Sequence, residues 1–173
     1  MYKEYSPCSV LAPFIYHFWE YKGETRSGLK FNIPPHGCSD LVFIVGNAAD
    51  CIRNSLIMKP YHSYFFGPMN TFTELVAHTN FIHIIGVRFR PCGLFQFIEI
   101  PLNELANQGI DSQEFPVLFS QSFIYQLCES NQNPIDIIEH ELVRQVYKNN
   151  MDTEKQISYA VSLISRQKGI VSR

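Results

Sequence analysis

The stretch FIHIIGVRFRPCG, residues 81–93, begins with the pattern of a strand and ends with that of a turn. Apolar side chains occupy both alternating faces of residues 81–89: Phe81, Ile85, Val87 and Phe89 on one face, and Ile82 and Ile84 on the other. A strand with two apolar faces is covered on both sides. We therefore predict a doubly covered strand over residues 81–89, which Pro91 ends because proline cannot donate to the ladder.

Four segments before this strand share its short, aromatic and β-branched character: residues 14–23, 39–46, 61–67 and 72–79. Clusters of glycine, proline and asparagine separate them, such as NIPPHGCS at 32–39 and GPMN at 67–70. Short strands joined by such turns are typical of an antiparallel sandwich or barrel. The pattern does not favour the alternation of strands and helices that a parallel sheet needs.

Beyond Pro91 the apolar period becomes helical. For residues 93–100 the pattern does not distinguish a short helix from a last strand. Further along the chain, Phe119, Phe123 and Leu127 recur at helical spacing. A second helix is expected to begin at the N-cap Asn133, and its apolar stripe consists of Ile135, Ile138, Leu142 and Val146. A third is expected over residues 153–168. The fold class is therefore α+β, with an N-terminal antiparallel barrel and a C-terminal bundle of about three helices.

Composition excludes several classes of protein. The chain of 173 residues can bury one sizeable core, and its 46% hydrophobic content argues against disorder. Its net charge of −2 gives no general attraction for nucleic acid or acidic lipid. The five cysteines form no Cys-x-x-Cys pair, which disfavours a zinc site or a disulfide framework. No apolar run approaches the ~18 residues of a membrane span, so we expect a soluble, cytoplasmic protein without membrane contact.

Motifs for catalysis are missing from the sequence. The six histidines include no His-x-His pair, which a cupin metal site requires, so we expect no metal and no other cofactor. No Gly-x-Ser-x-Gly turn and no phosphate loop occur. The one close spacing of a histidine and a cysteine, His36 with Cys38, we interpret as turn residues beside a buried thiol. We therefore expect no catalytic residues.

Three motifs occur in the order seen in one branch of the AraC-type transcription regulators: PPHGCSDLVFIVG at 34–46, FFGP at 65–68 and GVRFRPCGLFQFI at 86–98. They resemble that family's P-D-G…L-x-F motif, its Gly-Pro turn and its G-V-x-F-x-P-G-G motif. The segment ISYAVSLISRQKGIVS at 157–172 is similar to the first helix of the family's DNA-binding domain. The sequence departs from the family at His36, where aspartate is common, and at Cys92, where glycine is usual.

The resemblance implies a cupin-like barrel that binds an effector or dimerises, followed by helix-turn-helix units that bind DNA. It divides the chain into a sensory barrel at 1–100, a helical dimerisation or linker region at 101–150 and the start of the DNA-binding domain at 151–173. The helix that reads bases in a helix-turn-helix would follow Arg173. We therefore expect DNA to be a partner only through the missing C-terminal domain, and residues 1–173 alone to bind DNA weakly and in a salt-sensitive way.

A pocket for a small-molecule effector is the first candidate site. The aromatic side chains are concentrated in the strand-rich half, and ligand pockets are apolar and aromatic with few polar anchors. The predicted lining residues are Trp19, His83 and Arg88. By alternation Arg88 lies on an apolar face, where its charge must be paired. An effector carboxylate, Asp40 or Glu74 could each pair it, whereas Arg90 is expected to reach water.

A homodimer seam is the second candidate site, formed by the apolar row of Ile138, Leu142 and Val146 on the second helix. An effector would then change how the DNA-binding units of the dimer are presented. Two alternative functions stay open. One is a metal-dependent cupin enzyme, which the histidine spacing disfavours. The other is a ligand-free oligomerisation module whose barrel is filled by its own side chains.

Overall fold

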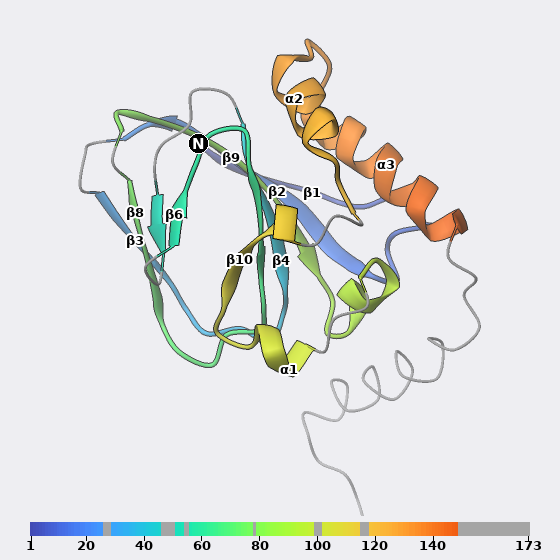
Figure 1. Cartoon of the computed structure of the whole chain (residues 1–173), viewed down its shortest axis with the longest axis horizontal. Coiled ribbons are helices and arrows are strands. Elements are labelled where there is room, and N and C mark those ends of the chain that lie inside the picture. Colours follow the sequence, from blue (N-terminus) through green and yellow to red (C-terminus); the bar gives the residue numbers. More distant parts are fainter. Residues whose placement is uncertain are drawn as a thin grey trace, which may run out of the picture.

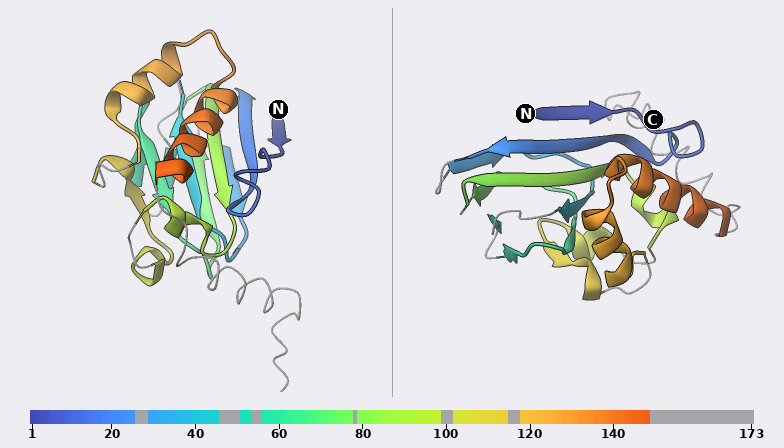
Figure 2. Two further views of the ribbon diagram at one scale, coloured as in Figure 1. Left: turned by 90° about the vertical axis from the view of Figure 1, so that its right-hand side faces the viewer. Right: turned by 90° about the horizontal axis from the view of Figure 1, so that it is seen from above.

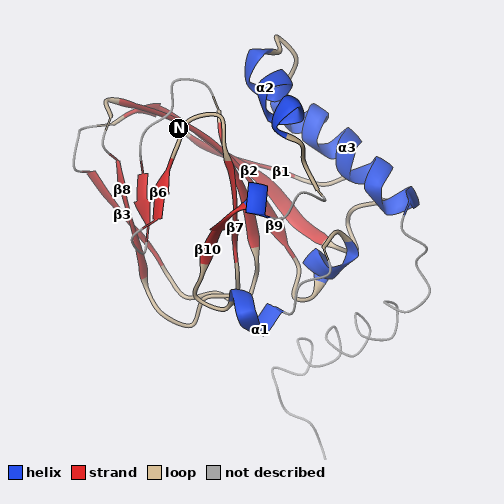
Figure 3. Cartoon of the chain, viewed as in Figure 1, coloured by secondary structure: helices blue, strands red, loops and turns tan. Residues whose placement is uncertain are grey.

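The computed structural model describes residues 1–25, 29–45, 51–53, 56–77, 79–98, 102–114 and 118–148. Every strand among these residues lies before residue 112, and the two longer helices follow residue 120 (Figures 1 and 3). The chain is therefore α+β, as the change of apolar period predicts.

The larger sheet is antiparallel and has the strand order β1 (Tyr2–Tyr5), β2 (Ile15–Glu24), β9 (Phe81–Phe89), β4 (Asp40–Ile44), β7 (Ser63–Phe66) and β10 (Gly109–Asp111). Strand β9 is an inner strand of this sheet and pairs with β2 on one side and β4 on the other. Ile85, Val87 and Phe89 belong to one buried cluster, and Ile82 and Ile84 belong to another. The doubly covered strand is confirmed.

The smaller sheet has the order β3 (Leu29–Ile33), β8 (Thr73–Ala77), β5 (Cys51–Arg53) and β6 (Leu56–Met58). It lies to one side of the larger sheet (Figures 1 and 2). Among the described residues no strand of one sheet pairs with a strand of the other. The strands therefore form two open antiparallel sheets, and the closed barrel that we predicted is not formed by them.

Five strands were not predicted, namely β1, β3, β5, β6 and β10. Each has three to five residues, and sequences such as YKEY, CIR and GID have no run of apolar alternation. Their positions come instead from pairing, as when β10 lies against β7 with Ile110 opposite Phe65. Since β10 belongs to the larger sheet, that sheet extends beyond residue 100.

The helical half agrees with the prediction over the described residues. Helix α2 (Gln121–Glu129) begins after Ser120, whose hydroxyl accepts a hydrogen bond from the backbone of Phe123. Helix α3 (Pro134–Lys148) is capped by Asn133, whose side chain accepts from the backbone of Ile135 at 3.1 Å. A short helix α1 (Leu102–Leu105) and 3-10 turns at Gly93–Gln96 and Ser112–Glu114 complete the elements. The helix predicted over 153–168, and with it the start of a DNA-binding domain, lies outside the described residues.

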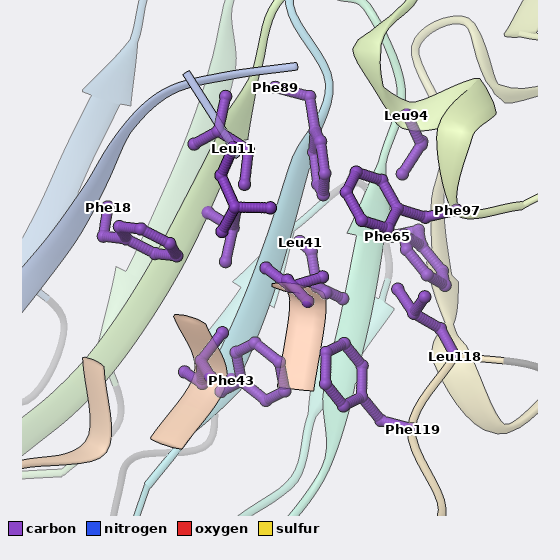
Figure 4. Packing of buried hydrophobic residues seen from close by; sticks show 14 of the residues in the cluster. Leu11, Phe18, Leu41, Phe43, Phe65, Phe89, Leu94, Phe97, Leu118 and Phe119 are labelled. Carbon is purple, nitrogen blue, oxygen red and sulfur yellow. The ribbon is translucent and has the colours of Figure 1, made fainter. Parts of the chain in front are cut away.

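The helices α2 and α3 cover the face of the larger sheet opposite the smaller sheet (Figure 1). Phenylalanines and leucines fill the space between them and the sheet, with Phe43 packed edge-on against Phe119 at a ring distance of 5.2 Å (Figure 4). No helix among the described residues is long and apolar enough to cross a membrane.

The apolar row that we predicted as a dimer seam lies in this core. Ile138, Leu142 and Val146 are all buried within the chain itself, in the cluster that also contains Phe65 and Val87 of the larger sheet. A side chain that is buried in its own chain cannot contact a partner. The predicted seam is therefore wrong, and the row holds α3 against the sheet.

Candidate ligand-binding cavity

A cavity of about 210 Å³ lies between the two sheets. The smaller sheet contributes Ile33, Met58 and Leu75 to its lining, each from a different strand. The larger sheet contributes apolar side chains from β4, β7 and β9: Val42, Phe66, Ile82 and Ile84. Most of the wall is therefore hydrocarbon, which is the usual composition of a small-molecule pocket.

Aromatic rings from β1 and β2 form another part of the wall. Trp19, Tyr21 and Tyr2 line the cavity, and the rings of Tyr2 and Trp19 are stacked with their centroids 6.3 Å apart. Trp19 lies across β9 at Gly86, where an added Cβ would come within 1.8 Å of the indole ring. The indole Nε1 of Trp19 is buried and has no hydrogen-bond partner among the described residues. Gly86 of the GVRFRPCG stretch thus makes room for the tryptophan.

The polar part of the wall is an ion pair between neighbouring strands. Arg88 of β9 donates from Nε and Nη2 to the two carboxylate oxygens of Asp40 of β4, both at 2.9 Å. Asp40 is only 3% exposed, and Nε2 of His36 lies 3.5 Å from its Oδ2. Burial alone would lower the pKa of the Arg88 guanidinium, but the hydrogen bonds that it donates to Asp40 outweigh this and raise that pKa.

This geometry decides between the two internal partners that the sequence left open for Arg88. Asp40 pairs it within the chain, whereas Glu74 pairs Lys30 at 2.6 Å on the smaller sheet. Two of the five N–H donors of Arg88 are used by Asp40. The donors on Nη1 have no acceptor among the described residues, and the side chain, which lines the cavity, is 27% exposed.

His83, the third residue predicted to line the pocket, is not among the lining residues that the structure describes. It pairs with Lys22 in the register of β9 with β2, and Nε2 of its ring lies 2.8 Å from Oε1 of Glu20. Burial lowers the pKa of His83, and the hydrogen bond with Glu20 only partly offsets this. Alternation along β9 places positions 83 and 88 on opposite faces, so the sequence already separated this histidine from Arg88.

Arg90 was expected to reach water, and the structure gives it a different role. Its Nε donates to the carbonyl oxygen of Ala12 at 2.8 Å, and its guanidinium lies 4.3 Å from the centre of the Tyr16 ring. The backbone of Arg90 also donates to the carbonyl of Phe14. Arg90 therefore holds the turn before β2 against the end of β9.

The turn after β9 shows what the departure at Cys92 means. Cys92 has a φ of 65°, in the left-handed region where glycine has no steric penalty. The chain therefore keeps a backbone geometry suited to glycine with a cysteine in its place. Gly93 is required for another reason, since an added Cβ would lie 2.1 Å from the carbonyl oxygen of Phe14.

Chemistry at the polar turn near the cavity is limited. Burial raises the pKa of the Cys38 thiol, which disfavours the nucleophilic thiolate. Nδ1 of His36 lies 3.1 Å from the carbonyl oxygen of Cys38, within hydrogen-bond distance of backbone rather than of the thiol. Over the described parts of the chain, no three side chains of histidine, cysteine, aspartate or glutamate are grouped as metal ligands.

Comparison with known families finds a match for the strand-rich half of the chain. Residues 3–111 match the family described as "Domain of unknown function (DUF6597)". The chain belongs to this family. The DUF6597 region begins at the second residue of β1 and ends with the last residue of β10, so it includes every side chain that lines the cavity except that of Tyr2. No curated protein matches the chain.

Sequence reasoning found part of this site. It placed Trp19 and Arg88 in the wall and named Asp40 as one of two internal partners for the arginine. It missed Tyr2, because YKEY has no strand pattern, and Ile33 and Met58 of the smaller sheet, because β3 and β6 were not predicted. A pocket between two sheets needs both sheets to be placed before its residues can be named.

Proposed function

We propose that the DUF6597 region of this chain binds a small molecule between its sheets and is the sensory domain of an AraC-type transcription regulator. The observation that supports this most is the cavity itself, since it combines a hydrocarbon wall, stacked aromatic rings and a single ion pair. Such a composition suits recognition of a ligand. The order of motifs at residues 34–46, 65–68 and 86–98 supports the regulator assignment.

The path from ligand to helices runs through β9. Ile84 of this strand lines the cavity, while its neighbour Ile85 belongs to the core under α2 and α3. A ligand that prefers one position of β9 would therefore also favour one packing of the helices. In the proposed regulator this changes how helix-turn-helix units after the helices are presented to DNA.

A homodimer remains part of the proposal, with a seam other than the buried row on α3. Tyr125 of α2 is 51% exposed and Tyr147 of α3 is 76% exposed, so each helix carries a large aromatic side chain on its outer side. Aromatic side chains are common anchors of interfaces. Sedimentation of the wild type and of Tyr147→Ser at high concentration tests this; a wild-type monomer contradicts the dimer.

The ligand-binding part is tested by filling the cavity. Leu75 lines it from β8, and its neighbour Val76 alternates to the other face of that strand, so Leu75→Phe and Val76→Phe form a matched pair. Small molecules that copurify with the folded protein are extracted and identified by mass spectrometry. We expect the same compound from the wild type and from Val76→Phe but not from Leu75→Phe.

The identified compound should also raise the melting temperature of the wild type, since a ligand at about a hundredfold excess over its dissociation constant adds about 2.7 kcal/mol. Equal stabilisation of Leu75→Phe would contradict binding in this cavity. Sequence-specific DNA binding by residues 1–173 at physiological salt would contradict the assignment as a sensory domain.

A further inference from the structure

We propose that the ligand of this cavity is an uncharged molecule of one ring with a short substituent that carries a hydrogen-bond acceptor. The inference rests on the proposed function, because it specifies the chemistry of that same site. Three properties of the cavity carry it: its volume, the internal neutralisation of its charge, and the kind of hydrogen-bonding group that its wall leaves unused.

Volume limits the ligand first. A dry apolar cavity of roughly 150 Å³ accommodates a benzene molecule. The cavity between the sheets has about 210 Å³ and is walled by side chains such as Val42, Ile84 and Leu75. It therefore has room for one ring and a substituent of a few atoms. The stacked rings of Tyr2 and Trp19 provide a flat surface suited to a planar ligand.

Charge limits the ligand next. Arg88 is the one positively charged side chain among the described residues that line the cavity, and Asp40 already neutralises it through two hydrogen bonds. A carboxylate ligand would bring a second negative charge close to Asp40 without a second cation, and this is costly in an apolar site. A cationic ligand would lie beside the guanidinium and find both oxygens of Asp40 engaged. An uncharged ligand has neither cost.

Hydrogen bonding sets the last property. The donors on Nη1 of Arg88 have no acceptor among the described residues, and the buried indole Nε1 of Trp19 has none either. The wall thus offers unused donors, whereas each oxygen of its carboxylate already accepts a hydrogen bond from Arg88. A ketone, aldehyde, ester or amide oxygen next to the ring would accept from Arg88 while leaving its pair with Asp40 intact.

Three planar probes of nearly equal shape test the charge preference at pH 7: acetophenone, benzoate and benzamidinium. Trp19 is the single tryptophan of the chain, so its indole N–H gives one resonance in a nitrogen-proton NMR spectrum. Titration of each probe against this resonance gives its affinity. We expect saturable shifts with acetophenone, and at least about tenfold weaker binding of both charged probes.

Variants make the result specific to the cavity. In Leu75→Phe the acetophenone shift should be lost, and in Val76→Phe it should be kept, because only the first change fills the cavity. Asp40→Asn keeps the shape of the side chain but frees the charge of Arg88. In this variant benzoate should gain about tenfold in affinity. The control for each variant is an NMR spectrum typical of a folded protein. The ranking of the three probes is measured on the wild type and does not depend on the variants.

The outcomes separate this inference from the function on which it rests. Tighter binding of benzoate or benzamidinium than of acetophenone to the wild type overturns the uncharged ligand and leaves a ligand-binding cavity in place. An acetophenone shift that survives in Leu75→Phe overturns the location of the site. No shift with any of the three probes overturns both proposals.

Discussion

The two faces of the larger sheet are covered by different means. On the helix side, Phe43 and Val87 are fully buried in an apolar cluster that includes side chains of α2 and α3. Figure 4 shows Phe43 of this cluster beside Phe119. On the other side, Ile84 and Trp19 face a smaller sheet and border an open volume of about 210 Å³. Both faces of β9 carry apolar side chains, and they differ in what lies opposite. Helices fill one face with long side chains, whereas short strands leave a space at the other.

The largest expected effect on stability comes from a substitution in the core between the larger sheet and the helices. Leu142 is fully buried between α3 and the sheet, so Leu142→Ala removes contacts that the core cannot rebuild. We expect the free energy of unfolding to fall by about 4 kcal/mol. Leu75→Ala, at the edge of the existing cavity, should cost only about 1 kcal/mol. Denaturant unfolding of both variants measures this, and equal losses would contradict the contrast between the faces.

The next effect concerns the ion pair of the cavity face. Arg88→Leu would leave the buried carboxylate of Asp40 without its cation, so we expect a loss of about 3 kcal/mol in unfolding free energy. Arg144→Leu removes a similar two-bond pair with Glu141, but Arg144 lies on the surface of α3. It should leave the unfolding midpoint almost unchanged. A similar loss of unfolding free energy in the two variants would show that the burial of Asp40 adds nothing to the cost of removing its cation.

A smaller effect is expected where Trp19 crosses β9. Gly86→Ala places a methyl group where the indole ring lies, and the ring must move. We expect a loss of about 2 kcal/mol in unfolding free energy and a shift in the tryptophan emission maximum. Gly37→Ala is the control, since an added Cβ there meets no atom within 4 Å. An unchanged emission spectrum in Gly86→Ala would place the indole elsewhere.

The smallest effect is a dependence on pH at the edge of the helix-side face, where Glu20 contacts His83 and Tyr5. Burial alone would raise the pKa of Glu20, but hydrogen bonds from Tyr5 and His83 hold it below its ordinary 4.5. The folded state therefore binds fewer protons than the unfolded state as the pH falls below 4.5, so stability declines there. Glu20→Gln should decline less steeply; chemical denaturation from pH 6 to 3 tests this.

His83 adds a second pH range in which the stability declines as the pH falls. Its pKa is lowered below the ordinary 6.5, chiefly by burial, so the unfolded state takes up a proton first as the pH falls below 6.5. Stability should thus begin to decline below pH 6.5, and His83→Asn should remove this early part of the decline. An identical profile for His83→Asn and the wild type would contradict the lowered pKa.

The comparison of the two faces also shows what the sequence could and could not predict. Strand β9 and helix α3 have long, regular apolar patterns, so their positions followed from periodicity alone. The burial of Leu142 in its own chain could not be told from a dimer seam, because both need the same stripe. Whether two sheets close into a barrel depends on which edges meet, and strands as short as β5 and β6 leave no pattern that fixes this.

The cavity was predictable only in part for the same reason. Alternation placed Arg88 on the face now seen to line it, and neighbouring strands suggested Asp40 as its partner. The same alternation should have excluded His83, which has the opposite parity. The contact of Trp19 with Gly86 could not be predicted, because it depends on the register of β2 on β9 that sets the two residues opposite each other. Pairing registers arise from the whole sheet, and no local pattern of residues specifies them.

Xenon binding tests most directly the claim that one face of the sheet is filled and the other is hollow. Xenon enters dry apolar cavities, and its position is visible by X-ray diffraction from crystals held under the gas. The structure predicts a xenon atom between the sheets, against Val42 and Ile84, and none between the larger sheet and α3. Xenon under α3, or none between the sheets, would contradict the account.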